Sequence, residues 1–115
     1  MDKKQYEAVL TYVNDFNGAT IDAETGNIAL LNNGYMVSLA GYEKQCKKMS
    51  FRALQKAEKT ARNLGGYLGV WVDEGVIYLD VSVCVDNIET AFMLGRKNEQ
   101  KAIFDNNLKT SIYLK

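Results

Sequence analysis

The sequence predicts an α+β fold in which about three helices lie on one face of a mostly antiparallel sheet. Two observations favour this prediction. A hairpin in the middle of the chain alternates apolar and polar residues, and three separate segments place apolar residues at helical spacing. Short strand candidates and turn formers lie between those segments. The predicted order is α-β-β-(β)-α-β-β-α-β-β, and residues 1–115 are expected to form a single compact domain.

The first helix is predicted to begin after Asp2, because Asp2 and Gln5 have the spacing of a capping box. It is predicted to end near Asn17-Gly18, where the apolar periodicity stops. Its apolar stripe consists of Tyr6, Val9, Leu10, Val13 and Phe16.

Short strands are expected next at 19–22, 28–31 and 35–39, with turn formers between them. Asn33-Gly34 favours a two-residue hairpin in front of the last of these strands. Either of the two earlier strands is a candidate partner for 35–39. Residues 42–49 show no regular pattern and are expected to be irregular.

A second helix is predicted after Ser50, which is a favourable N-cap residue. Gly65-Gly66 is expected to end it. Its apolar stripe consists of Phe51, Leu54, Ala57, Ala61 and Leu64.

The central hairpin spans 67–86 and is predicted to turn at Glu74-Gly75. A two-residue loop there places Trp71 opposite Tyr78. In that register, one face of the hairpin carries only Leu68, Val70, Val72, Ile77, Leu79 and Val81. The other face carries Tyr67, Gly69, Trp71, Asp73, Tyr78, Asp80 and Ser82.

A third helix is predicted to begin at Asp86, which forms a capping-box pattern with Glu89. Strands at 102–105 and 110–114 are expected to follow, joined by a turn at Asn106-Asn107. The apolar face of this helix is expected to carry Ile88, Ala91, Phe92 and Gly95.

Composition excludes several classes of function. Fourteen basic residues balance fourteen acidic ones, so net charge gives no argument for nucleic acid or a membrane surface. The chain has no histidine, which removes the commonest general base and metal ligand. Cys46 and Cys84 are expected to be reduced and buried. We therefore expect a cytoplasmic protein that is not an enzyme and that has no membrane segment, metal or cofactor.

Three aromatic residues on the less apolar hairpin face, Trp71, Tyr78 and Tyr67, are predicted to form a protein-binding surface. The alternative is that Trp71 and Tyr78 only stabilise the hairpin as a cross-strand pair, or lie in the core. This alternative holds if helices cover both faces of the sheet.

The second helix carries a basic stripe that is a candidate contact for phosphates or for an acidic partner. Its members are Arg52, Lys56, Lys59 and Arg62. The plainer interpretation is a solvated helix face, because Lys and Arg are good helix formers. A third hypothesis, a small enzyme that acts through Asp80, Asp86 or Cys84, requires further groups from distant parts of the sequence.

Several phrases of the sequence resemble small uncharacterised proteins encoded by bacteriophages, plasmids and other bacterial mobile elements. They are Gly18-Ala-Thr-Ile-Asp22, Thr25-Gly-Asn27, Gly34-Tyr-Met-Val-Ser-Leu-Ala-Gly-Tyr-Glu43, Tyr67-Leu-Gly-Val-Trp-Val-Asp73, Tyr78-Leu-Asp-Val-Ser82 and Asn98-Glu-Gln-Lys-Ala-Ile-Phe-Asp105. The resemblance implies an accessory protein that acts inside the host bacterial cell. By analogy, such proteins commonly bind other proteins, and interference with host defence is one outcome.

The sequence therefore favours a non-enzymatic binding protein that contacts a host or phage protein. A nucleic-acid-binding accessory protein that uses the basic second helix is the alternative. A homo-oligomer is a further option, because an edge strand at 110–114 could pair with another copy of the chain.

Overall fold

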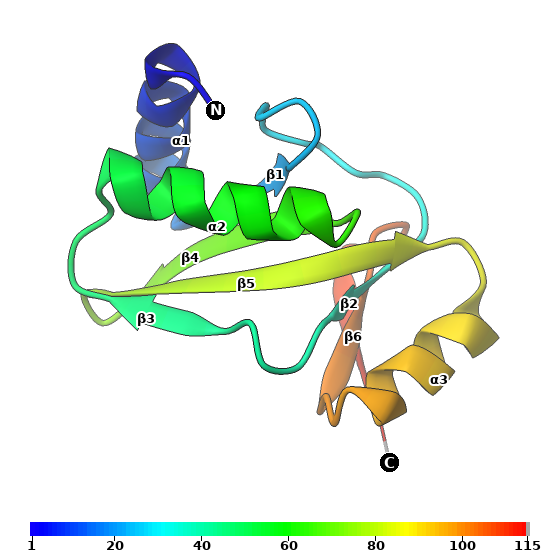
Figure 1. The fold of residues 1–115 in the computed structure, drawn as a ribbon. Coiled ribbons are helices and arrows are strands. Elements are labelled where there is room, and N and C mark those ends of the chain that lie inside the picture. Colours follow the sequence, from blue (N-terminus) through cyan, green and yellow to red (C-terminus); the bar gives the residue numbers. More distant parts are fainter. Residues whose placement is uncertain (115) are drawn as a thin grey trace.

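In the computed structural model, which describes residues 1–114, three helices and seven strands follow the predicted order (Figure 1). The helices are α1 (Lys3–Phe16), α2 (Phe51–Asn63) and α3 (Ile88–Lys97). The strands are β1 (Gly18–Asp22), β2 (Tyr35–Ser38), β3 (Lys44–Cys46), β4 (Tyr67–Asp73), β5 (Val76–Val85), β6 (Ala102–Asp105) and β7 (Thr110–Tyr113).

All strand pairs are antiparallel and belong to one sheet with the order β1-β4-β5-β2-β6-β7. The long strand β5 organises this sheet. β4 pairs along one of its edges, and β3 and β2 pair one after the other along its opposite edge. The predicted α+β class with an antiparallel sheet is therefore confirmed.

The central hairpin has the predicted register. Trp71 lies opposite Tyr78, and the turn at Glu74-Gly75 has positive φ values of 49° and 77°. These backbone angles suit a tight turn whose twist matches that of the flanking strands. The register fixes which residues of β4 and β5 share each face of the sheet.

Helices α1 and α2 pack on the apolar face of this hairpin (Figure 1). Leu54 of α2 and Val9 of α1 are fully buried there. The main core cluster consists of Val9, Val13, Ile21, Ala23, Leu54, Ala61, Leu68, Val70, Leu79 and Val81. It contains Leu68, Val70, Leu79 and Val81 of the hairpin, and the partly buried Val72 and Ile77 pack against it.

Helix α3 packs against β2 and β6 and encloses a second core cluster. Val37, Ala91 and Ile103 form its buried centre, and Val83 and Val85 pack against it. Val83 and Val85 continue the alternation of β5, so they lie on the same face of the sheet as Leu79 and Val81. All three helices of the described chain therefore cover one face, as predicted, and none of them lies on the other face.

The helix termini follow the sequence signals at two of three starts. Asp2 and Gln5 form the predicted capping box on α1, and the Ser50 hydroxyl accepts from the backbone of Ala53 at the start of α2. The predicted cap of α3 is wrong by one residue. Asn87, not Asp86, accepts from the backbone N–H groups of Glu89 and Thr90.

Three predictions for the segment before α2 are also wrong. Residues 28–31 make only one isolated bridge, between Ile28 and Ile21, and no strand. The strand β2 pairs with β5 and β6 rather than with an earlier strand, so Asn33-Gly34 is not a hairpin turn. Residues 42–49, predicted to be irregular, contain the short strand β3.

Both cysteines are free, as predicted, but each is only partly buried. The last strand, β7, is an edge of the sheet. None of the helices in the described part of the chain has the length and apolar character needed to cross a membrane.

Candidate functional site

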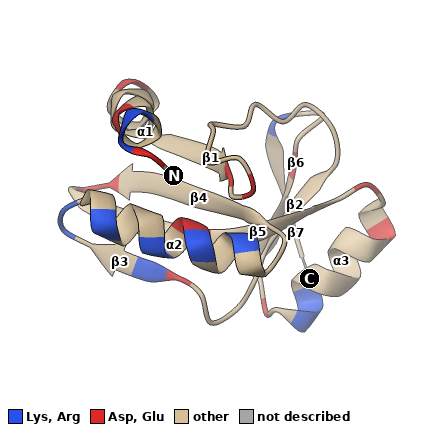
Figure 2. Ribbon diagram, turned by 45° about the horizontal axis from the view of Figure 1, so that its top comes forward, with Lys and Arg blue, Asp and Glu red and all other residues tan. Residues whose placement is uncertain are grey.

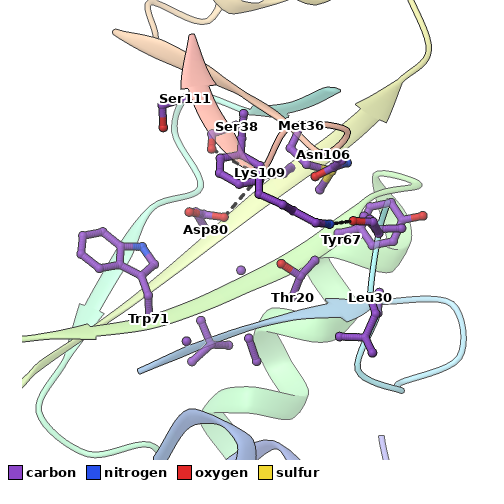
Figure 3. Close-up of a pocket in the computed structure, with 18 of the residues that line it drawn as sticks. Thr20, Leu30, Met36, Ser38, Tyr67, Trp71, Asp80, Asn106, Lys109 and Ser111 are labelled. Carbon is purple, nitrogen blue, oxygen red and sulfur yellow. Dashed lines mark hydrogen bonds between the residues drawn. The ribbon is translucent and has the colours of Figure 1, made fainter. Parts of the chain in front are cut away.

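The uncovered face of the sheet is hollowed into a groove of about 870 Å³. Its floor is formed by β4, β5 and β2, and it is bounded by residues 29–32 and by the β6–β7 hairpin (Figure 3). We call this hollow the sheet groove. The volume falls in the range typical of ligand sites, roughly 300–1,000 Å³.

Asp80 lies on the floor of the sheet groove, opposite Gly69 of the neighbouring strand. A Cβ atom on residue 69 would collide with the Oδ1 atom of Asp80. The missing side chain of Gly69 therefore leaves the space in which the Asp80 carboxylate lies. A larger residue at position 69 would force the Asp80 carboxylate to move from this place.

Desolvation by the surrounding strands raises the pKa of Asp80 above its ordinary value of 3.8, and the nearby charge of Glu43 raises it further. The Ser82 hydroxyl and the Trp71 indole act in the opposite direction. The Ser82 hydroxyl donates to Oδ1 at 3.4 Å, and the indole nitrogen of Trp71 lies on the side of its ring that faces Asp80 (Figure 3). The carboxylate is therefore partly desolvated, and the contacts with Ser82 and Trp71 offset only part of the cost of its charge.

No counter-ion accompanies Asp80 within the described residues. The two ion pairs found among residues 1–114 both involve Glu58. Lys109 borders the sheet groove, but its amine donates to the backbone carbonyl of Leu31 (Figure 3). Lys44 pairs with Leu79 across β3 and β5, which places its side chain on the helix-covered face.

Trp71 and Tyr78 stack on one another on the uncovered face. Their ring centroids are 4.2 Å apart and their planes differ by 14°. Trp71 remains 43% exposed, and Tyr78 is partly buried. Since helices cover only the opposite face, this pair does not belong to the core. Its exposure leaves a large aromatic surface beside Asp80.

Tyr67, the third residue of the predicted protein-binding surface, lies deeper on the same face. It is partly buried between Asp22 of β1 and Ser82 of β5. Burial raises the pKa of its hydroxyl, and the charge of Asp22 contributes. The Ser38 and Ser82 hydroxyls lie 3.3 Å apart on the neighbouring strands. This part of the floor therefore presents hydroxyl groups.

Two backbone contacts hold the segment 29–34 against the β6–β7 hairpin. The amide side chain of Asn106 donates to the carbonyl of Asn33 at 3.0 Å, and its backbone N–H donates to Gly34 at 2.9 Å. Together with Lys109, these contacts tie the two boundaries of the groove to each other. The groove is thus shaped by segments that are more than seventy residues apart.

The basic stripe is separate from the sheet groove, because α2 lies on the opposite face of the sheet. Arg52, Lys56 and Lys59 are exposed along α2 (Figure 2). Arg62 differs from these three residues because its guanidinium forms an ion pair with the buried carboxylate of Glu58 at 3.2 Å.

The residues of the enzyme hypothesis, Asp80, Asp86 and Cys84, lie in different surroundings. Asp80 lies in the groove, whereas Asp86 is exposed beyond the end of β5. Burial raises the pKa of the Cys84 thiol, and the charge of Asp86 raises it further, which disfavours the nucleophilic thiolate. Within the described chain, no group of three or more acidic or cysteine side chains is arranged to hold a metal ion.

The sequence analysis named Asp80 as a residue of the polar strand face and of the enzyme hypothesis, but it did not identify the role of Gly69 opposite it. The available signal was a glycine opposite an aspartate in the predicted register. It also missed the boundary residues 29–32 and Lys109, because their contacts depend on tertiary structure.

The fold and the groove define an α+β protein with an open, hollowed sheet face. In comparisons with known proteins, no family model matches, and neither the curated proteins nor the solved structures give a significant match. The groove itself is therefore the basis for any statement about function.

Proposed function

We propose that this protein is a non-enzymatic binding protein that holds a peptide segment of another protein in the sheet groove. The observation that carries the proposal is the exposed Trp71, stacked on Tyr78, at a hollow on the helix-free face of the sheet. Large aromatic side chains are enriched where protein partners bind. The resemblance to mobile-element proteins suggests a host or phage protein as the partner.

Further apolar side chains around the groove support a protein partner. Leu30 is 72% exposed on one boundary, and Phe104 is 37% exposed on the other. An extended peptide offers both side chains and backbone polar groups. Its side chains would suit the apolar residues on the two boundaries, and its backbone would suit the hydroxyl groups of the floor. The floor hydroxyls can donate to and accept from such a backbone.

We expect the double variant Trp71→Ala/Tyr78→Ala to weaken peptide binding at least tenfold, because aromatic anchors dominate interface energetics. A displayed library of random peptides is selected on the full chain, and a selected peptide is then titrated against each variant. Trp71 is the single tryptophan, so its fluorescence reports occupancy of the groove in the wild type. Calorimetry gives the affinity of the double variant.

Tyr113→Ala is the matched control. Tyr113 is 76% exposed on β7 and does not line the groove, so the variant is expected to bind like the wild type. Circular dichroism checks that each variant is folded. If no peptide is recovered, or if the folded double variant binds as tightly as the wild type, the proposal is wrong.

A second candidate function is nucleic-acid binding through α2, supported by the exposure of Arg52, Lys56 and Lys59 along one helix (Figure 2). We expect a gel shift with duplex DNA that weakens steeply with salt and disappears when all three residues are changed to glutamine. Lys97→Gln, an exposed change on α3, is the control. Absence of a shift at low ionic strength would exclude this function.

A further inference from the structure

Asp80 is an unusual feature of the groove floor because its carboxylate is partly desolvated and has no ion-pair partner among residues 1–114. A lone charge in such a position destabilises a fold unless something compensates it. Neutral residues of similar size would fill the same space without this cost. The position of Asp80 is explained if its counter-ion arrives with a ligand.

Gly69 shows how the groove accommodates this carboxylate. Because residue 69 has no side chain, the Asp80 carboxylate lies close to the backbone of β4. The carboxylate accepts the long contact from Ser82 and lies beside the Trp71 indole. An ionised carboxylate accepts about four hydrogen bonds, so acceptor positions remain for an incoming donor.

The charges around Asp80 also favour a cation. Glu43 adds a second negative charge near the carboxylate, and its side chain accepts from the backbone of Gly41 at 3.1 Å. Among the described residues, the cation on the groove boundary is Lys109, which is bound to Leu31. The part of the groove around Asp80 therefore offers negative charge that the described protein does not neutralise.

Trp71 supplies the second component of a cation site. It lies beside Asp80 on the same face and is 43% exposed. The aliphatic stem of a lysine or arginine packs well against an aromatic surface, while the charged head reaches a carboxylate. A cation above an aromatic ring also gains from the ring quadrupole.

We propose that the sheet groove selects peptide segments that carry a lysine or arginine side chain, which ion-pairs with Asp80 beside Trp71. This inference rests on the proposed function, because it names the side chain that anchors the peptide. Charge complementarity with the unpaired carboxylate is the observation that identifies the occupant. The raised pKa of Asp80 agrees with this proposal. It shows that the free protein disfavours the charged carboxylate, and an arriving cation would favour it again.

The test compares libraries of random peptides selected separately on the wild type and on Asp80→Asn. We expect peptides selected on the wild type to carry Lys or Arg at one position, and those selected on Asp80→Asn to lose this preference. Asp73→Asn is the control, because Asp73 is an exposed carboxylate on the same face outside the groove. It should select the same peptides as the wild type.

A double-mutant cycle makes the test quantitative. A selected peptide and its variant with citrulline or norleucine at the cationic position are titrated against the wild type and Asp80→Asn. We expect the change in the peptide to weaken binding at least tenfold on the wild type and to have little effect on Asp80→Asn. This coupling is not produced by a merely structural role of Asp80.

The outcomes separate this inference from the proposed function. Peptides that bind through Trp71 and Tyr78 without a cationic preference would overturn the inference and leave the proposed function standing. Recovery of no peptide would overturn both. Arginine amide is the probe for a small cationic ligand, and binding as tight as that of the whole peptide would overturn the peptide assignment.

Discussion

Leu54→Ala will lower the free energy of unfolding by about 2–5 kcal/mol, because it opens a cavity under the sheet. Leu54 has no exposed surface and packs in the main core cluster between α2 and the hairpin. A close-packed core closes such a cavity only in part, so most of the lost contacts are not replaced. Denaturant unfolding followed by circular dichroism measures the change.

The matched comparison is Trp71→Ala, which removes a larger side chain from the other face of the same sheet. It is expected to cost less than Leu54→Ala, because Trp71 is 43% exposed and its cross-strand pairing with Tyr78 contributes about 0.2–1 kcal/mol. A larger loss for Trp71→Ala than for Leu54→Ala would contradict the assignment of the groove face as an uncovered surface.

Asp80→Asn will stabilise the free protein at neutral pH. Asparagine has nearly the same shape, can still accept from Ser82, and has no charge to desolvate. The free protein therefore gains stability from a change that is expected to weaken cation binding. Such opposition between stability and function is common where a site holds a destabilised group.

The pH dependence follows from the direction of the shift. The pKa of Asp80 is higher in the folded state than its ordinary value of 3.8, so the folded state binds this proton more tightly. Stability from this group is complete below about pH 3.8 and is lost as the pH rises through the folded-state pKa. The free energy of unfolding of Asp80→Asn should therefore exceed that of the wild type by an amount that grows from about pH 3.8 through the folded-state pKa and stays constant at higher pH.

Thermal unfolding of both proteins across acidic to neutral pH measures this difference. The charged groups at Asp80 are Glu43 beside it and Lys109 on the groove boundary, and both remain in the variant. Asp73→Asn removes an equal charge at an exposed position and should shift stability less. If Asp80→Asn is no more stable than the wild type at neutral pH, desolvation of the Asp80 carboxylate does not destabilise the fold.

Most of the secondary structure could be predicted because its signals are local. The alternation from Leu68 to Val81 specified the hairpin register, since a slip of one residue would expose the whole apolar face. The capping box at Asp2 and the N-cap at Ser50 likewise depend on residues within one helical turn. The one cap predicted at the wrong residue is that of α3, where Asp86 and Asn87 are adjacent and both are favourable N-cap residues.

The failures concern contacts between distant segments. Asn33-Gly34 has the sequence of a hairpin, but the Gly34 carbonyl accepts from Asn106 and β2 pairs with β5 instead. The segment around 28–31 has strand-like residues, but its last hydrogen bond to β1 is from Ala29 to Thr20, and beyond it the segment borders the groove. Local patterns cannot indicate which strand a segment joins, because pairing energy comes from partners far along the chain.

The sequence by itself determined the helices, the central hairpin and the division of that hairpin into an apolar and a polar face. The sequence also predicted that helices cover one face. Only the tertiary structure decided whether Trp71 and Tyr78 lie in the core, and it places them on the face that the helices leave open. It also decided that residues 29–32 and the β6–β7 hairpin enclose a groove above Asp80. The physical reason is that side-chain periodicity is a property of neighbouring residues, whereas a groove depends on how distant segments pack.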